Sequence, residues 1–233
     1  MSKLERRDFI KKLGIAGMLS FGMRNNILLG KEVKMSNSTP RPNIIFLLTD
    51  DQRWDALSCA GNSIIHTPNM DKMAKNGIRF TNAFVTTSIC AASRASIFTG
   101  VVERTHGYTF GTPPVPEHYA ENSYPLILRS AGYRTGFVGK YGVQMDIDVN
   151  QLFDSFVKLG RNPYFKKQPD GTVKHLTDIT GDKAIEFLRS CSPDQPFCLS
   201  VSFNAPHAED SDPKQYIWPK SVDHLYEDVV IPE

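Results

Sequence analysis

Three stretches of consecutive apolar and β-branched residues predict the strands of a buried sheet, at 43–49, 134–138 and 197–203. Four segments of helical composition lie between these strands, at 67–76, 91–98, 124–131 and 178–190. Residues 78–85 predict a short extended segment. An unbroken apolar run is typical of a strand covered on both faces, so we expect the first strand to be central. The alternation of strands and helices predicts an α/β fold, with a mostly parallel sheet and helices on both faces.

Polar residues follow each of the three predicted strands directly. Asp50 and Asp51 follow the first strand, Lys140 follows the second, and His207 closes the segment after the third. Parallel strands end at the same edge of a sheet, and open α/β folds bind their ligands outside that edge. We therefore expect these side chains to meet at one site.

The N-terminal 42 residues differ from the rest of the chain. Residues 1–30 contain Arg6-Arg7-Asp8-Phe9-Ile10-Lys11, which resembles a twin-arginine export signal, and a modest apolar run over 13–23. That run is far shorter than the ~20 residues that span a bilayer, so no stable membrane anchor is expected. Residues 31–42 are polar and predict a linker. The sequence thus predicts a protein exported to the periplasm or beyond, with one domain over 43–233. A basic amphipathic N-terminal helix is the alternative.

Composition narrows the function classes. Hydrophobic residues make up 40% of the 233 positions and charged residues 22%, as in ordinary soluble globular proteins. The formal net charge of +2 does not indicate a nucleic-acid partner. The four cysteines are Cys59, Cys90, Cys191 and Cys198, and no two of them form a CxxC pair, so a zinc site is not expected. Spacing leaves open whether Cys191 and Cys198 pair, and buried free thiols are the simplest interpretation for all except Cys90.

The most specific signal is the segment Cys90-Ala91-Ala92-Ser93-Arg94-Ala95-Ser96-Ile97-Phe98-Thr99-Gly100. It resembles the sulfatase signature, in which Cys or Ser precedes any residue, Pro or Ala, Ser, Arg and a later Thr-Gly. The resemblance is to the N-terminal catalytic part of formylglycine-dependent sulfatases, which belong to the alkaline phosphatase superfamily. In that family a separate maturating enzyme oxidises the cysteine to Cα-formylglycine, which implies that Cys90 becomes the nucleophile.

The chemistry of a helix start agrees with this role for Cys90. A group in the first turn faces free backbone N–H donors and the positive end of the helix dipole, which stabilise a sulfate or an oxyanion. Arg94 lies four residues later on the same helical face, where its guanidinium can hold sulfate oxygens. The hydrated aldehyde offers two hydroxyls, one to attack sulfur and one whose deprotonation expels sulfate and restores the aldehyde.

The adjacent carboxylates of Asp50 and Asp51 indicate a cation. Two carboxylates at the end of a buried strand repel one another, and a hard divalent ion with oxygen ligands relieves that repulsion. Calcium tolerates irregular carboxylate geometry better than magnesium does. The resemblance implies that Asp50, Asp51 and the formylglycine at Cys90 are calcium ligands.

Lys140 takes its expected role from the same resemblance. Gly139-Lys140-Tyr141-Gly142 stands where sulfatases commonly carry Gly-Lys-Trp-His. The family lysine contacts sulfate and the formylglycine, and a cation there stabilises charge that develops in the transition state. Gly142 replaces the family histidine, which leaves the base of the elimination step open.

Two histidines are further candidates for substrate binding. Asn204-Ala205-Pro206-His207 resembles the family segment Asn-x-Pro-His, which implies that His207 contacts the sulfate or acts as the acid for the leaving group. His106 belongs to a His-Gly pair shortly after the signature helix and is expected to line the pocket. A structural loop histidine is the alternative for His106.

The resemblance runs from about residue 42 to about residue 219. Sulfatases are usually much longer, and their C-terminal half supplies further calcium ligands, so we expect a truncated or split chain with an incomplete calcium site. The leading hypothesis is an exported hydrolase of sulfate esters that acts on a sulfated small molecule or glycan. A phosphonate or phosphodiester hydrolase of the same superfamily is the second hypothesis. A truncated, non-catalytic remnant that folds poorly or only binds sulfated ligands is the third.

Overall fold

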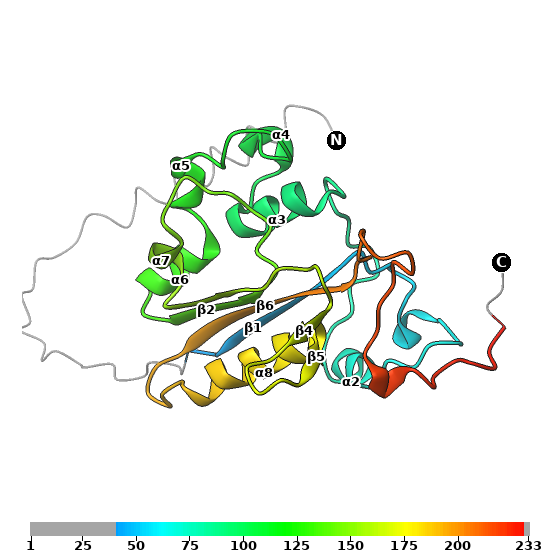
Figure 1. Cartoon of the computed structure of the whole chain (residues 1–233). Helices are drawn as coiled ribbons and strands as arrows, with labels where there is room; N and C mark the ends of the chain where they lie inside the picture. Colours follow the sequence, from blue (N-terminus) through cyan, green and yellow to red (C-terminus); the bar gives the residue numbers. More distant parts are fainter. Residues whose placement is uncertain (1–40, 231–233) are drawn as a thin grey trace, which may run out of the picture. The chain divides into compact units, whose positions relative to one another are not determined.

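The computed structural model describes residues 41–230, which form a parallel sheet with helices on both faces (Figure 1). The signal predicted over 1–30 and nearly all of the linker over 31–42 lie outside the described residues. The strands are β1 (Ile44–Asp50), β2 (Arg134–Gly139), β3 (Ser155–Lys158), β4 (Phe165–Lys167), β5 (Val173–His175) and β6 (Phe197–Pro206). The α-helices are α2 (Pro68–Asn76), α3 (Cys90–Thr99), α4 (Glu103–His106), α5 (Glu117–Ala120), α6 (Tyr124–Ser130), α7 (Val149–Leu152) and α8 (Leu176–Arg189). Two 3-10 turns are η1 (Ser58–Ala60) and η2 (Lys220–Val222).

The main sheet has the strand order β1-β6-β2-β3, and all of its neighbouring strands are parallel. Strands β4 and β5 form a separate antiparallel pair. The α/β class and the three predicted strands are confirmed, as are the four predicted helices within one or two residues at most ends. The four-residue strand β3 was not predicted, and residues 78–85 form no strand.

Strand β1 is an edge strand within the described residues, so the prediction of a central strand is wrong for this part of the chain. Only β6 pairs with it, from Ile44 opposite Cys198 onward. Ile45 and Leu47 are 50% and 51% exposed although both are strongly apolar. The apolar run indicates a strand suited to cover on both faces, but no strand among residues 41–230 pairs along this edge.

Helices α3 and α8 lie on opposite faces of the sheet (Figure 1), and the buried apolar side chains form two separate clusters. On the face of α3, the rings of Phe98 and Phe137 pack against Tyr141, with centroids 5.4 and 5.3 Å apart respectively. On the face of α8, Phe187 packs against the strand residues Leu199 and Val201. Burial of each large apolar side chain contributes roughly 1.5–3 kcal/mol, so the central strands are held firmly between the two cores.

Two glycines of β2 permit close approaches that bring the site together. A Cβ at Gly136 would overlap the ring of Phe187, so glycine lets α8 lie against the sheet. Gly139 has a φ of 111°, and a Cβ there would overlap the carbonyl of Ser202 on β6. The ends of β2 and β6 therefore come very close together just before Lys140.

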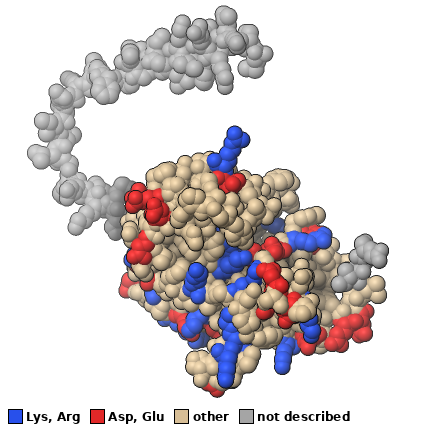
Figure 2. Space-filling model, turned by 45° about the horizontal axis from the view of Figure 1, so that its top comes forward, with Lys and Arg blue, Asp and Glu red and all other residues tan. Residues whose placement is uncertain are grey.

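Charged side chains of both signs lie interspersed on the face shown in Figure 2. None of the helices described between residues 41 and 230 combines the length and the apolarity of a membrane span.

Candidate active site

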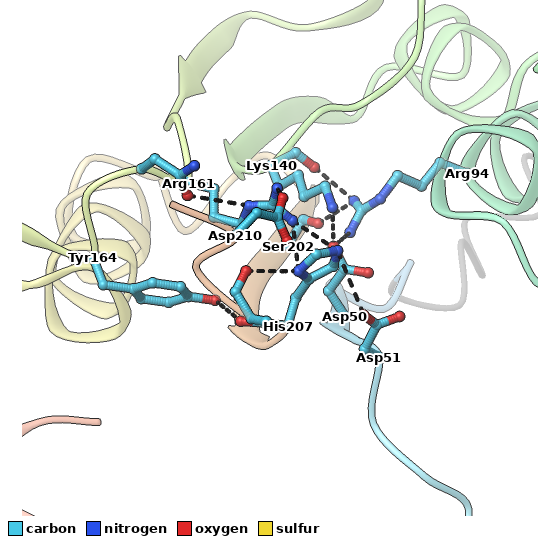
Figure 3. Close-up of polar contacts among 11 residues, drawn as sticks. Asp50, Asp51, Arg94, Lys140, Arg161, Tyr164, Ser202, His207 and Asp210 are labelled. Carbon is cyan, nitrogen blue, oxygen red and sulfur yellow. Dashed lines mark hydrogen bonds and ion pairs between the residues drawn. The ribbon is translucent and has the colours of Figure 1, made fainter. Parts of the chain in front are cut away.

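The expected meeting of polar side chains is found at the carboxyl edge of the main sheet (Figure 3). Asp50 is the last residue of β1, Lys140 follows β2, and His207 follows β6. Arg94 reaches the same place from α3, which lies over one face of the sheet. Four elements that are distant in sequence thus supply one cluster.

Asp50 lies at the centre of this cluster and is only 5% exposed. Its carboxylate forms an ion pair with the ammonium of Lys140, and Arg94 Nη2 lies 3.5 Å from Oδ2. Two cations therefore face one buried carboxylate, so Arg94, Lys140 and Asp50 together carry a net positive charge. Such a net charge in a partly desolvated place favours the binding of an anion.

Arg94 is fixed by three partners and is 4% exposed. Besides facing Asp50, its Nη1 donates to the Lys140 carbonyl at 2.6 Å and to Ser202 Oγ at 2.5 Å. Burial lowers the pKa of the guanidinium, while the nearby Asp50 and Cys90 oppose that shift. The planar fork of arginine suits this triple contact better than a lysine ammonium would.

Cys90 is the first residue of α3 and is half-buried. The preceding residue, Ile89, has no side-chain acceptor, so no side chain caps the first N–H groups of the helix. Cys90 is a free thiol, and so are Cys59, Cys191 and Cys198, which settles the open question of a Cys191–Cys198 pair. Burial raises the pKa of Cys198 to about 11, in keeping with an inert thiol.

Asp51 and His207 form the outer side of the cluster. Asp51 has a φ of 60°, in the left-handed region, and its side chain is 64% exposed. His207 Nε2 lies 3.4 Å from Asp51 Oδ2, and Nδ1 lies 2.8 Å from the carbonyl of Ala208. A proton on Nδ1 would be donated to that carbonyl, and Nε2 would then accept from Arg161 Nη1, which lies 2.7 Å away.

The oxygen donors at this edge fit a hard cation in kind but not in number. Asp50 and Asp51 supply carboxylates, and the buried Asn204 at the end of β6 has neither amide atom hydrogen-bonded among the described residues. Calcium takes about six to eight oxygen ligands. Residues 41–230 contain no group of three His, Cys, Asp or Glu that could hold a metal ion. A calcium site here needs further ligands from elsewhere.

Gly142 occupies the position of the family histidine and packs against Arg94. Its φ is 65°, and an added Cβ would lie 2.9 Å from Arg94 Cδ. A side chain at this position would therefore displace Arg94 or move the backbone. Glycine at position 142 therefore permits the Arg94 side chain to pack closely against the backbone that follows Lys140.

The structure does not bring His106 to this cluster. Its ring is buried against α3, with Nε2 3.1 Å from Ser96 Oγ, and Nδ1 accepts the backbone N–H of Tyr108 at 3.0 Å. Burial lowers its pKa below the ordinary value of 6.5. These contacts are those of a structural histidine, the alternative considered for this residue.

Two polar residues of the cluster were missed by the sequence analysis. Ser202 lies on β6 and accepts from Arg94, and Arg161 follows β3 and contacts His207 (Figure 3). Neither belongs to a recognisable motif. The strand-end rule that found Lys140 and His207 would have found Arg161 only if β3 had been predicted.

Comparison with known proteins agrees with this geometry. The family model described as sulfatase matches residues 42–226. The chain belongs to the sulfatase family. This sulfatase chain is 36% identical to an N-acetylglucosamine-6-O-sulfatase of Bacteroides thetaiotaomicron, over 72% of the chain and 31% of the relative. It is 52% identical to an ulvan-active sulfatase of Formosa agariphila, over 76% of the chain and 32% of the relative.

A solved structure shares the fold of this sulfatase chain. It is the structure of a protein in complex with its substrate D-glucosamine-2-N,6-O-disulfate. The two proteins superpose with a TM-score of 0.61 and are 35% identical, over 72% of the present chain and 35% of the solved one. The chain therefore spans about a third of the length of these relatives.

Proposed function

We propose that this sulfatase chain binds a sulfate ester and carries the nucleophile for its hydrolysis. The observation that supports this most directly is the convergence of Arg94 and Lys140 on the buried Asp50, beside the helix that starts at Cys90. The excess positive charge matches a tetrahedral sulfate, and the uncapped start of α3 adds backbone donors.

The roles of the side chains follow from their positions. Oxidation of Cys90 to formylglycine by the maturating enzyme supplies a hydrated aldehyde with two hydroxyls. One hydroxyl oxygen bonds to sulfur as the S–O bond to the leaving alcohol breaks. The other hydroxyl is then deprotonated, which expels sulfate and restores the aldehyde. Arg94 holds the reacting centre with a guanidinium that its three contacts keep in place. His207 lies at the outer side of the site, with Nε2 3.4 Å from Asp51 Oδ2, and is assigned contact with the sulfate or the leaving oxygen.

Asp50 and Asp51 would hold calcium, which supplies positive charge for the sulfate oxygens. With a divalent cation on Asp50, Lys140 loses its only carboxylate partner in the described residues, so its ammonium becomes available to the substrate. Further calcium ligands come from outside residues 41–230.

The substrate class proposed here is a sulfated saccharide. Two relatives are named for N-acetylglucosamine-6-O-sulfate and for ulvan, and the similar solved structure contains a disulfated glucosamine. We also propose export through the signal over 1–30 and maturation of Cys90 by a formylglycine-generating enzyme before or during export. Fractionation of the native host tests the export, with the chain expected outside the cytoplasm.

The mass of the tryptic peptide that contains Cys90 tests the central proposal. Protein purified from its native host should carry an aldehyde in place of the thiol, and it should release sulfate from an aryl sulfate faster than phosphonate from a matched aryl ester. Cys90→Ala is the control and should abolish turnover.

An unmodified thiol would favour the non-catalytic alternative, and faster phosphonate release would favour the phosphonate hydrolase. A calcium titration adds an independent measurement, because a ligand that binds only the folded state raises its melting temperature. The remnant alternative predicts almost no rise.

A further inference from the structure

Arg161 is a third cation at the sulfate site, and its contacts differ from those of Arg94 and Lys140. It lies three residues after the end of β3, and Nη1 lies 2.5 Å from Nδ1 and 2.7 Å from Nε2 of His207 (Figure 3). Its Nη2 forms an ion pair with Asp210. Arg161 therefore lies directly beside the residue expected to contact the sulfate.

Two hydrogen bonds of the buried Tyr164 hold the loops that carry Arg161 and His207 side by side. Tyr164 N–H donates to Glu209 Oε2 at 2.8 Å, and Tyr164 O–H donates to the His207 carbonyl at 2.6 Å. Tyr164 is 1% exposed and Glu209 is 8% exposed. The backbone positions of Arg161 and His207 are thus well determined relative to each other, which a recognition site requires.

The ion pair of Arg161 is more exposed than that of Arg94, although Arg161 Nη1 faces His207 and Nε donates to Asn162 Oδ1 at 3.3 Å. The Arg161 side chain is 22% exposed, and its carboxylate partner Asp210 is 62% exposed. Exposed ion pairs contribute little to stability, so a ligand anion can replace Asp210 at small cost. Asp50, in contrast, is buried and is shared by Arg94 and Lys140. Arg161 is the cation of this cluster that a second anion can reach.

We propose that Arg161 is a specificity-determining residue that binds a second anionic group of the substrate. This group is a sulfate or a carboxylate that lies near the scissile sulfate, on the same sugar or on the neighbouring one. The inference rests on the proposed function, because it takes the sulfate site as the reference point. Arg161 Nη2, which now pairs with Asp210, can donate a charge-assisted hydrogen bond to either oxyanion. Asp210 competes with that group, so it sets how strongly polyanionic substrates are preferred over monoanionic ones.

Calorimetric titration of the full chain with paired ligands tests this role. The first pair is glucosamine 6-sulfate and glucosamine 2-N,6-O-disulfate. The second pair is a monosulfated disaccharide with a neighbouring uronic acid and its neutral-sugar counterpart. Wild type should bind the more anionic member of at least one pair more tightly, and the pair that shows the preference identifies sulfate or carboxylate as the second group.

Two substitutions should move the preference in opposite directions. Arg161→Gln should reduce the preference by about tenfold, as expected for one lost charge-assisted contact, because it weakens binding of the more anionic ligand more than that of the less anionic one. Arg161→Lys should retain part of it. Asp210→Asn should increase it, because the competing carboxylate is removed. Lys183→Gln, which removes the same charge from the exposed pair with Glu186 on α8, is the matched control and should change nothing.

Equal losses for both members of a pair with Arg161→Gln would show that Arg161 only positions His207, and this would overturn the proposal. An unchanged preference, or no binding of any of these ligands by wild type, would overturn it too. Aryl sulfate turnover is measured separately. Absent turnover with an intact, Arg161-dependent preference would refute the proposed hydrolysis while leaving this inference in place.

Discussion

Replacing Arg94 with Lys keeps a positive charge beside Asp50 but removes the planar fork that reaches three partners. The two hydrogen bonds from Nη1, to the Lys140 carbonyl and to Ser202 Oγ, would be lost in a place that is only 4% exposed. Hydrogen bonds to charged groups contribute about 1.5–3 kcal/mol each. We expect Arg94→Lys to lower the free energy of unfolding by about 3–5 kcal/mol, a large share of the total stability of a typical domain.

A double-mutant cycle of Arg94→Lys and Ser202→Ala isolates the contact between Arg94 and Ser202. The free energy of unfolding of the wild type, both single variants and the double variant is measured in urea. Ser202→Ala removes one of the two bonds and should cost about 1.5–3 kcal/mol. The double variant should lose less than the sum of the single losses, by about 1 kcal/mol, because both single substitutions break the same bond. Arg53→Lys is the matched control, since Arg53 is 79% exposed and, among residues 41–230, forms an ion pair only with Asp55 at the surface. Losses that add to within about 0.5 kcal/mol would refute this account of Arg94.

Three further predictions concern single positions. Gly136→Ala places a Cβ against the ring of Phe187 and should lower the free energy of unfolding by about 1–3 kcal/mol in urea. Gly142→His should displace Arg94 rather than restore a base, so calorimetric titration with sulfate should show weaker binding than in wild type. Burial lowers the pKa of His106 below 6.5, so the unfolded chain takes up a proton that the folded chain resists. The contribution of His106 to the free energy of unfolding should therefore be fully present above pH 6.5 and be lost as the pH falls towards the lower folded-state pKa. Urea titrations at a series of pH values should show a shallower fall for His106→Gln.

Local sequence signals were sufficient to predict the inner part of the site. Cys90 and Arg94 are four residues apart in a helix that ends at a glycine, and Asp50, Lys140 and His207 directly follow strands. Because parallel strands end at one edge, their order along the chain was enough to predict that they meet.

The outer part of the site depends on pairings that no local pattern encodes. Arg161 reaches His207 only because β3 adds to the sheet beside β2, and a strand of four residues is too short to show a clear alternation. The prediction for His106 rested on its distance from the signature along the chain, whereas its burial against Ser96 depends on how α4 folds back over α3. The apolar pattern of β1 was interpreted correctly as strand but wrongly as central, since burial depends on the neighbours of a strand.

The open edge of β1 has a consequence for metal binding. The strand that ends in Asp50 is hydrogen-bonded to one neighbour in the described residues, so its outer amides should exchange with deuterium faster than those of β2. A polypeptide that pairs along this edge would slow that exchange and, in the same step, restrain the backbone that carries Asp50 and Asp51. Calcium affinity and the protection of the β1 amides against exchange should therefore rise and fall together. The exchange rate of one strand then indicates whether the site can bind calcium.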